Sequence, residues 1–301
     1  MDKSRQQTDK RLAEMEKHLA GIYERANKEV GEKWKAYMDR AAEAVKPYEK
    51  AVEAAKKSGD ADAIKKAEAA LAQKQKSVTI LDAHYRNMTT QLAAELSNVN
   101  KTAAAYINDQ LPELYAINYN GIGTGIESAV QGYSFELVDA NTVKNLATKD
   151  ETLLPYKYID GRKDIRWNTQ AVNSEVLQGI IQGESIPNIA KRLRNVTDMN
   201  RASAVRNART ATTGAENRGR MDMLRSAKEK GVNAKKVWLA TNDNRTRDAH
   251  AELDGEEMDI DEPFVNELGE IMFPGDPDAD PANTYNCRCT LKYKVVGFEG
   301  K

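Results

Sequence analysis

The chain has 301 residues, of which 30% are charged, 40% are hydrophobic and 6% are aromatic, and its formal net charge is -1. This length predicts about two domains, and the near-zero net charge indicates no particular partner. No run of about 18 apolar residues occurs, which excludes a transmembrane helix.

The start of the chain and its cysteines indicate the compartment. Residues 1–6 are charged and lack the apolar core of a signal peptide. The 2 cysteines, Cys287 and Cys289, do not resemble a secreted disulfide framework. We therefore expect a protein that is made and kept in a reducing, cytosol-like compartment, with no membrane partner.

Residues 1–110 are helical in pattern. The first helix is expected to be kinked or ended by Pro47, and Ser58, Gly59 and Asp60 predict a turn after it. Its apolar or small residues recur every three or four positions: Leu12, Met15, Leu19, Ile22 and Ala26, then Val30, Trp34, Tyr37, Ala41, Ala44 and Tyr48.

A second apolar seam follows the turn, with Lys74 and Glu95 as polar interruptions of a heptad-like stripe. The seam consists of Ile64, Ala67, Leu71, Lys74, Val78, Leu81, Tyr85, Met88, Leu92, Glu95 and Val99. Two long amphipathic helices joined by a short turn predict an antiparallel, coiled-coil-like hairpin arm. Its seams would bind a partner or pack on the rest of the chain; alternatively, the arm is simply a pair of solvated helices.

Residues 111–236 form a mixed, mainly helical middle region. Leu111 and Pro112 predict the end of a helix. The glycine-rich segment 120–125 lacks the preceding strand and the Lys-Ser/Thr pair of a phosphate-binding loop, so we expect a flexible connector. Helical patterns return at residues 169–182 and 185–193, the second with Ser185 as its N-cap.

A basic segment lies at residues 191–220, which contain eight basic and two acidic residues. Arg206, Arg209 and Arg220 fall on one face of a helix. Such a face would neutralise DNA phosphates or an acidic protein surface. The alternatives are a solvated helix face, or salt bridges to the acidic C-terminal region.

Residues 237–301 predict a small α+β module. A strand is expected at residues 236–240, followed by a polar turn or short helix at 243–250. Phe264-Val265 and Ile271-Met272-Phe273 flank a predicted hairpin turn, and residues 290–296 alternate as a final strand. The fold class is therefore α+β: a long helical hairpin, a helical middle region and a small C-terminal module.

Over residues 150–296 a set of motifs follows in order: Arg209-Thr210, Trp238, Asp243, Arg245, Arg247, His250, Asp254, Gly255, Phe264, Pro274-Gly275 and finally Asn286, Cys287, Arg288 and Cys289. This order resembles the Mu F-like phage head morphogenesis family, whose members close on an Asn-Cys-Arg-Cys-like motif. Ala211 follows the Arg209-Thr210 pair where members often carry an acid, which Glu216 could replace from the next turn.

The resemblance implies a minor head protein of a tailed phage that acts in head morphogenesis at the portal vertex. Its implied partners are the portal protein and other head or scaffold proteins, with double-stranded DNA as a further contact. The implied location is the virion, after synthesis in the cytoplasm of the bacterial host.

The chemistry of the C-terminal module permits two sharper hypotheses. His250, Cys287 and Cys289 are zinc-ligand types, and Asp243, Asp248 or Asp254 could supply a fourth ligand. The alternative is that the cysteines simply pack beside the histidine. We predict in either case that these three side chains lie close together, because the final strand must pair near the segment that carries His250.

The alternative function is enzymatic. In a phosphodiester-cleaving nuclease, His250 would be the general base and Asp243 or Asp248 would orient it. Arg247, with Arg245 or Arg288, would stabilise phosphate charge. Alternatively, these side chains form ion pairs with one another and are structural. A third hypothesis for the function is a sequence-nonspecific DNA-binding module.

Overall fold

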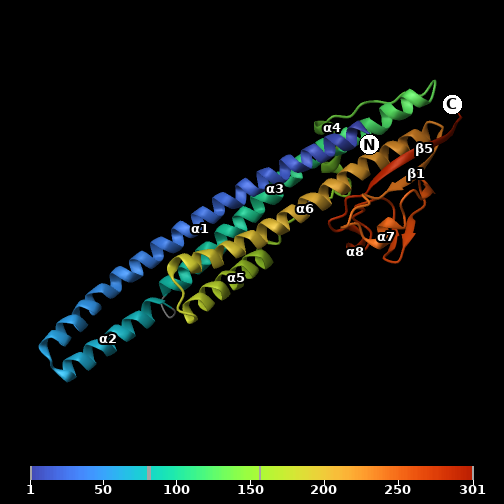
Figure 1. The fold of residues 1–301 in the computed structure, drawn as a ribbon. Coiled ribbons are helices and arrows are strands. Elements are labelled where there is room, and N and C mark those ends of the chain that lie inside the picture. Colours follow the sequence, from blue (N-terminus) through green and yellow to red (C-terminus); the bar gives the residue numbers. More distant parts are fainter. Residues whose placement is uncertain (1, 80–82, 156, 300–301) are drawn as a thin grey trace. The chain divides into compact units, whose positions relative to one another are not determined.

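The computed structural model describes residues 2–79, 83–155 and 157–299, and it confirms an α+β fold (Figure 1). No helix of the described residues is long and apolar enough to cross a membrane. The helices are α1 (Lys3–Ser58), α2 (Ala61–Thr79), α3 (Ala83–Ala129), α4 (Ala140–Lys149), α5 (Gly161–Ile181), α6 (Ile186–Glu229), α7 (Asp248–Ala251) and α8 (Pro281–Thr284). The strands are β1 (Val232–Leu239), β2 (Glu257–Asp259), β3 (Phe264–Asn266), β4 (Gly269–Ile271) and β5 (Thr290–Phe298).

The chain divides into two compact units that cut across the three regions expected from sequence. Unit 1 comprises Met1–Leu19, Ala103–Tyr158 and Ser203–Lys301, and unit 2 comprises Ala20–Thr102 and Ile159–Ala202. Helices α1, α3 and α6 each contribute residues to both units. The C-terminal module is therefore part of a larger, discontinuous unit.

Unit 2 contains the predicted antiparallel hairpin (Figure 1). Lys56 pairs with Glu68 near the turn, and Tyr23 donates a hydrogen bond to Asn100 at the other end. The numbers of the paired residues change in opposite directions, as antiparallel packing requires. Gly59 has a φ of 72°, which suits the tight turn between α1 and α2.

The helix α1 continues through Pro47, so the expected end of the helix there is wrong. Val45 and Val52, on either side of the proline, are both buried, and this packing favours a continuous helix. The seam residue Leu81 lies outside the described residues. Farther along the hairpin, the predicted seams form the core of unit 2, where α5 and α6 also contribute: Val30, Trp34, Tyr37, Tyr85, Met88, Leu92, Leu96, Val172, Val176, Ile189, Leu193 and Val196.

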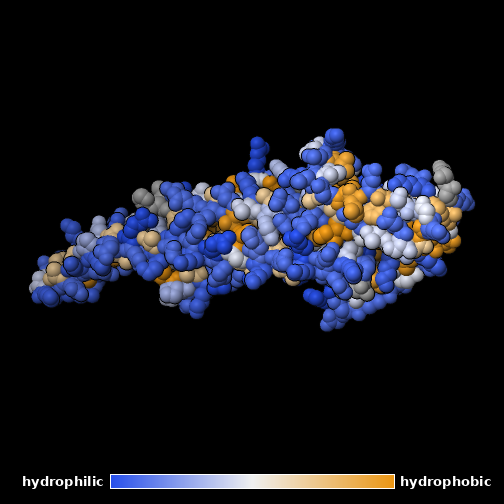
Figure 2. All heavy atoms as spheres, turned by 90° about the horizontal axis from the view of Figure 1, so that it is seen from above, coloured by the Kyte–Doolittle hydropathy of each residue, from blue (hydrophilic) through white to orange (hydrophobic). Residues whose placement is uncertain are grey.

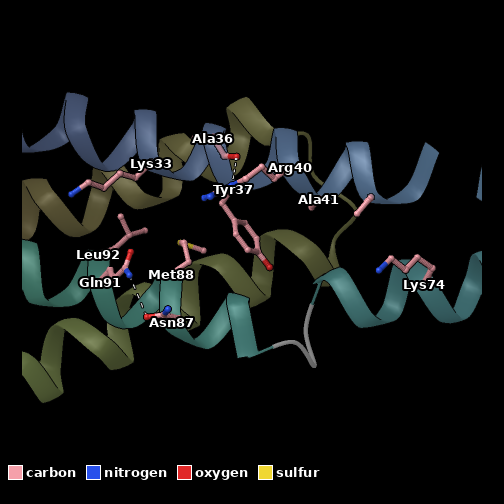
Figure 3. Close-up of a pocket in the computed structure, with 11 residues that line it drawn as sticks. Lys33, Ala36, Tyr37, Arg40, Ala41, Lys74, Asn87, Met88, Gln91 and Leu92 are labelled. Atoms are coloured by element: carbon pink, nitrogen blue, oxygen red, sulfur yellow. Dashed lines mark hydrogen bonds between the residues drawn. The ribbon is translucent and has the colours of Figure 1, made fainter. Parts of the chain in front are cut away.

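A cavity of about 620 Å³ interrupts the hairpin seam of unit 2 (Figure 3). Small residues of α1, including Ala36 and Ala41, leave the space open, and Tyr37 and Met88 line it from opposite helices.

Two predicted breaks in unit 1 are also wrong, because α3 continues through Pro112 and through the glycine-rich segment 120–125. These glycines serve close packing. A Cβ atom on Gly121 would lie 2.6 Å from Cβ of Ser4, and one on Gly123 would lie 2.4 Å from the ring of Phe135. A Cβ on Gly125 would lie 2.2 Å from Oη of Tyr293. Helical glycines at regular spacing thus mark close contacts rather than a flexible connector.

The predicted C-terminal strands are confirmed, in two small antiparallel sheets. One sheet has the order β2-β1-β5, and the other pairs β3 with β4. Trp238 of β1 is opposite Leu291 of β5, and both are fully buried. Trp238 also packs edge-on against Phe264. The sheet therefore buries one face in the core of unit 1, which α3 and α6 complete with residues such as Ile126 and Leu224.

Hydrophilic residues cover most of the face shown in Figure 2, and hydrophobic residues appear there as separate patches. Individual exposed apolar side chains include Leu137, Tyr158 and Ile181. The apolar seams are thus mostly turned inward within each unit. Of the alternatives given for the apolar seams, packing on the rest of the chain is the one that the core of unit 2 shows.

Candidate functional site

His250 lies in the short helix α7, and its side chain is buried in unit 1 with only 1% of its surface exposed. The loop after β1 brings α7 back against the sheet. The ring of Trp238 meets the imidazole edge-on at a centroid distance of 5.3 Å. A large aromatic residue of the strand thus fixes one side of the histidine.

Cys287 and Cys289 lie between α8 and β5, where both thiols are free and buried. Their Sγ atoms are 3.6 Å and 3.7 Å from Nδ1 of His250. The three ligand-type atoms all lie within 4.8 Å of one another. The prediction that these residues come together is confirmed.

A chain of amides fixes the orientation of the imidazole. The backbone N–H of Leu268 donates to Oδ1 of Asn266, so the amide nitrogen of Asn266 faces Oδ1 of Asn283 at 3.1 Å. That same oxygen is 2.8 Å from Nε2 of His250. Because an amide oxygen only accepts, Nε2 carries the proton and Nδ1 presents a lone pair to the two thiols.

The two thiols differ in acidity. The hydrogen bond from Cys287 lowers the pKa of Cys289 to about 5, although burial opposes the shift. Donating that hydrogen bond, together with burial, raises the pKa of Cys287. The pair therefore holds one thiolate readily and resists holding two in the absence of a further positive charge.

The other candidate site residues, two of them catalytic candidates and Asp254 a possible zinc ligand, anchor loops. Asp243 accepts two hydrogen bonds from Arg288, at 2.5 Å and 2.6 Å, and this pairing holds the pKa of Asp243 well below its usual value. Arg247 donates to the carbonyl of Tyr285. Asp254 accepts from the backbone N–H of Ala240 at 2.9 Å.

The structure does not assemble the predicted nuclease site. Asp243 is engaged with Arg288, and the two ring nitrogens of His250 face Asn283 and the cysteines. A general base needs a ring nitrogen within reach of a substrate proton. The arrangement instead supports the other hypothesis, in which the ion pairs between Arg and Asp side chains are structural.

A polar ladder along α6 joins the cysteine segment to the helix. Thr210 Oγ1 accepts from the backbone N–H of Asn286 at 2.9 Å, and Thr213 Oγ1 donates to the carbonyl of Cys287 at 2.7 Å. The side chain of Asn217 accepts from the N–H of Leu291 at 2.8 Å. This ladder was not predicted from the sequence, although the helical spacing of Thr210, Thr213 and Asn217 indicates that these polar side chains share one face of α6.

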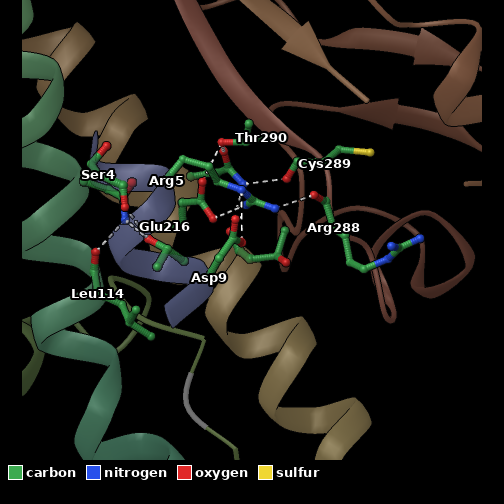
Figure 4. A network of polar contacts seen from close by, with 12 residues as sticks. Ser4, Arg5, Asp9, Leu114, Glu216, Arg288, Cys289 and Thr290 are labelled. Atoms are coloured by element: carbon green, nitrogen blue, oxygen red, sulfur yellow. Dashed lines mark hydrogen bonds and ion pairs between the residues drawn. The ribbon is translucent and has the colours of Figure 1, made fainter. Parts of the chain in front are cut away.

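A buried charge network occupies the next part of the same helix (Figure 4). Glu216 is fully buried and pairs with Arg5 at 2.5 Å, while Thr290 donates to its other oxygen at 2.6 Å. Arg5 also donates to the carbonyl of Arg288 at 2.9 Å. The acid one turn beyond Ala211 is thus structural: it ties the start of α1 to the segment beside the cysteines.

The prediction that Arg220 lies on a DNA-binding face is wrong. Its side chain is fully buried, pairs with Asp2 at 2.8 Å and donates to the carbonyl of Leu291 at 2.9 Å. Burial alone would raise the pKa of Asp2, but the hydrogen bond and charge of Arg220 hold it well below its usual value. An arginine enclosed in this way cannot reach a phosphate.

The other bases of α6 are largely paired within their own units. Arg209 pairs with Glu16 at 2.7 Å, whereas Arg206 is exposed. Arg192 pairs with Glu184 at 2.7 Å. The acids that pair with Arg209 and Arg192 thus come from α1 and from the loop before α6, whereas Lys228 near the end of α6 pairs with Asp261 of the acidic C-terminal region at 2.6 Å. The basic surplus of residues 191–220 therefore does not form one free face.

The chain is similar to two curated proteins and to one family. Residues 170–292 match the family described as Phage Mu protein F like protein. The NAD(+)--arginine ADP-ribosyltransferase EFV of Enterococcus faecalis (strain ATCC 700802 / V583) is 32% identical over 210 residues, which cover 66% of this chain and 40% of that protein. The minor head protein GP7 of Bacillus phage SPP1 is 28% identical over 199 residues, covering 65% of this chain and 64% of that protein.

The chain thus spans less than two thirds of the length of either relative. No solved structure matches the chain. The matched family segment begins in α5 and includes the ladder of α6, His250 and both cysteines. The residues described above therefore lie almost entirely within the segment that carries the similarity.

Proposed function

The chain belongs to the Mu F-like family of phage head proteins, and from this premise we propose that it is a minor head protein that assembles at the portal vertex of a tailed phage. The observation that carries the proposal is the joint match to the family over residues 170–292 and to a minor head protein over 199 residues. Head morphogenesis is the role this similarity supports, and the portal is the partner we assign to it.

The architecture of unit 1 suits a part in an assembly. Its titratable and charged candidate residues are buried: His250, Glu216 and Arg220 are each at most 1% exposed. Buried polar groups with satisfied partners hold a fold in one arrangement, whereas a catalytic site must admit a substrate. The charge network and the polar ladder thus act as internal ties that would keep the unit rigid in a head.

We do not extend the proposal to DNA contact through α6. Arg220 is enclosed and Arg209 is paired, which leaves Arg206 as the exposed member of the three. Non-specific DNA binding depends on several free cations acting together. One exposed arginine gives little affinity at physiological salt.

The transferase activity in the name of the enterococcal relative is not carried over either. The match covers 40% of that protein, so the larger part of it lies outside the similarity. The part that this chain shares with it overlaps the Mu F-like segment.

Co-expression of the full chain with the portal protein of the same phage tests the proposal. We expect the two proteins to co-elute from a size-exclusion column at the size of a portal ring. The matched control is co-expression with the major capsid protein alone, which should leave the chain at its own elution volume. Elution apart from assembled portal rings at micromolar concentrations would contradict portal binding.

A further inference from the structure

The separations within the His250 cluster match those of a metal site. A tetrahedral zinc ion with Zn–S bonds of about 2.3 Å and a Zn–N bond of about 2.0–2.1 Å places sulfur and nitrogen about 3.5–3.6 Å apart. The Sγ atoms of Cys287 and Cys289 lie 3.6 Å and 3.7 Å from Nδ1 of His250. The two edges from Nδ1 to the Sγ atoms thus match those of a coordination tetrahedron, and all three ligand atoms lie within 4.8 Å of one another.

The amides behind the histidine complete the arrangement that metal-binding histidines have. A ligating imidazole donates its other N–H to an oxygen, which fixes the tautomer and the ring orientation. Nε2 of His250 faces Oδ1 of Asn283 at 2.8 Å, and Asn266 holds that amide in place. Nδ1 consequently carries the free lone pair, which points at both thiols.

The ligand types select the metal. Two thiolates and one imidazole suit zinc, whereas magnesium and calcium prefer oxygen ligands. Burial of all three side chains adds to the selectivity, because a cation would offset the repulsion between two neighbouring thiolates. Without a metal, a thiol S–H can donate to the same lone pair, so zinc content is the measurement that separates the two arrangements.

We propose that His250, Cys287 and Cys289 bind one zinc ion, which clamps α7 to the segment between α8 and β5. The two ends of the clamp are 37 residues apart in sequence, at His250 and Cys287. Closing this loop stabilises a module in which β2, β3 and β4 have only 3 residues each. The zinc site is independent of the head role proposed above.

The fourth position of the tetrahedron is assigned to a water molecule. The carboxylates expected from sequence have other partners: Asp243 binds Arg288, and Asp254 binds the N–H of Ala240. Among the described residues, the cluster contains the histidine and the two cysteines and no carboxylate. Three protein ligands plus water is a coordination that zinc commonly adopts.

The test uses the full chain, purified under reducing conditions without a metal-affinity tag. Elemental analysis should find about one zinc per chain. X-ray absorption at the zinc edge should give two sulfur neighbours at about 2.3 Å and two nitrogen or oxygen neighbours at about 2.0–2.2 Å. Replacement by cobalt should give thiolate-to-metal absorption in the near ultraviolet.

Variants assign the ligands. Cys287→Ser, Cys289→Ser and His250→Gln should each lose zinc, while His18→Gln should retain it, because His18 stacks on Tyr106 elsewhere in the unit. Asn283→Leu should weaken zinc affinity by about 10- to 100-fold, and Asn283→Asp, which keeps the acceptor for Nε2, should restore it.

Wild-type measurements keep the proposal testable if the ligand variants fail to fold. Wild-type protein that contains no zinc, and that takes up neither Zn²⁺ nor Co²⁺ added at micromolar concentration, overturns it. So does a zinc edge spectrum with only nitrogen and oxygen neighbours, or full zinc content in folded Cys287→Ser protein.

Discussion

The two units use different means to hold the same long helices together. In unit 2, α6 contributes Ile189, Leu193 and Val196 to an apolar core at helical spacing. In unit 1, the same helix contributes Thr210, Thr213, Asn217, Glu216 and Arg220 to buried hydrogen bonds and ion pairs. A single helix thus changes from hydrophobic packing to polar contacts along its length.

This difference has a physical consequence. Hydrophobic packing is tolerant, because neighbouring side chains partly fill a gap. A buried charge network tolerates substitutions poorly, because removal of one charged side chain leaves its partners buried and unpaired in a medium of low polarity. We therefore expect unit 1 to be more sensitive to single substitutions than unit 2, and the following predictions test that contrast.

The largest effect is expected for Glu216→Ala. The substitution leaves Arg5 and Arg220, which are 14% and 0% exposed, without their shared buried partner. The free energy of unfolding should fall by about 3–5 kcal/mol. Hydrogen exchange followed by mass spectrometry should show the loss of protection in unit 1.

The control for Glu216 is Glu113→Ala, which removes an exposed ion pair with Arg11 in the same unit. Exposed pairs contribute only about 0–1 kcal/mol. Equal effects of the two substitutions would show that burial of the Glu216 network does not matter.

Leu92→Ala tests the core of unit 2. Leu92 is fully buried, so truncation should cost about 2–5 kcal/mol, with the loss of protection in unit 2. Leu137→Ala, at a side chain that is 73% exposed, should change stability by less than about 0.5 kcal/mol. Protection lost throughout unit 1 as well would mean that the two units unfold as one.

Glycine substitutions should change stability in opposite directions in the two units. A Cβ on Gly219 of α6 would lie 2.5 Å from the carbonyl oxygen of Tyr115, so Gly219→Ala should destabilise unit 1 by about 1–3 kcal/mol. A Cβ on Gly31 of α1 meets nothing within 4 Å. Gly31→Ala should therefore stabilise unit 2 by about 0.5–1 kcal/mol through helix propensity. Thermal unfolding of both variants gives the two signs.

The last of these predictions concerns pH. Lys236 is buried, and burial lowers its pKa to about 8. Its unfolded-state pKa is about 10.4, so between these values the unfolded chain binds the proton that the folded chain has lost. Stability attributable to Lys236 should therefore rise as pH rises from 8 to about 10. Denaturant titrations of Lys236→Met over this range should lack that rise, and an unchanged profile would refute the assignment.

Much of the fold could be predicted from sequence, because hydrophobic periodicity reports which face of a helix or strand is buried. The hairpin seam around Trp34 and Leu92, the turn at Gly59 and the strand that contains Leu291 were all predicted in this way. Local rules failed at Pro47 and Pro112, where long-range packing keeps each helix continuous.

The site could be predicted only in part. Ligand chemistry and topology were enough to bring His250 and the two cysteines together. The enclosure of Arg220 could not be predicted, since an arginine at helical spacing has the same pattern whether solvent or Asp2 faces it. Gly125 was wrongly assigned to a flexible connector for a related reason, because its close approach to Tyr293 joins residues far apart in the sequence.

The central proposal for this chain is that it is a structural component of a phage head. Quantitative mass spectrometry of purified heads tests that claim directly. We predict peptides of this chain at a few copies per portal ring, retained after washing with high salt. Heads that form normally and contain none of this chain would contradict the account.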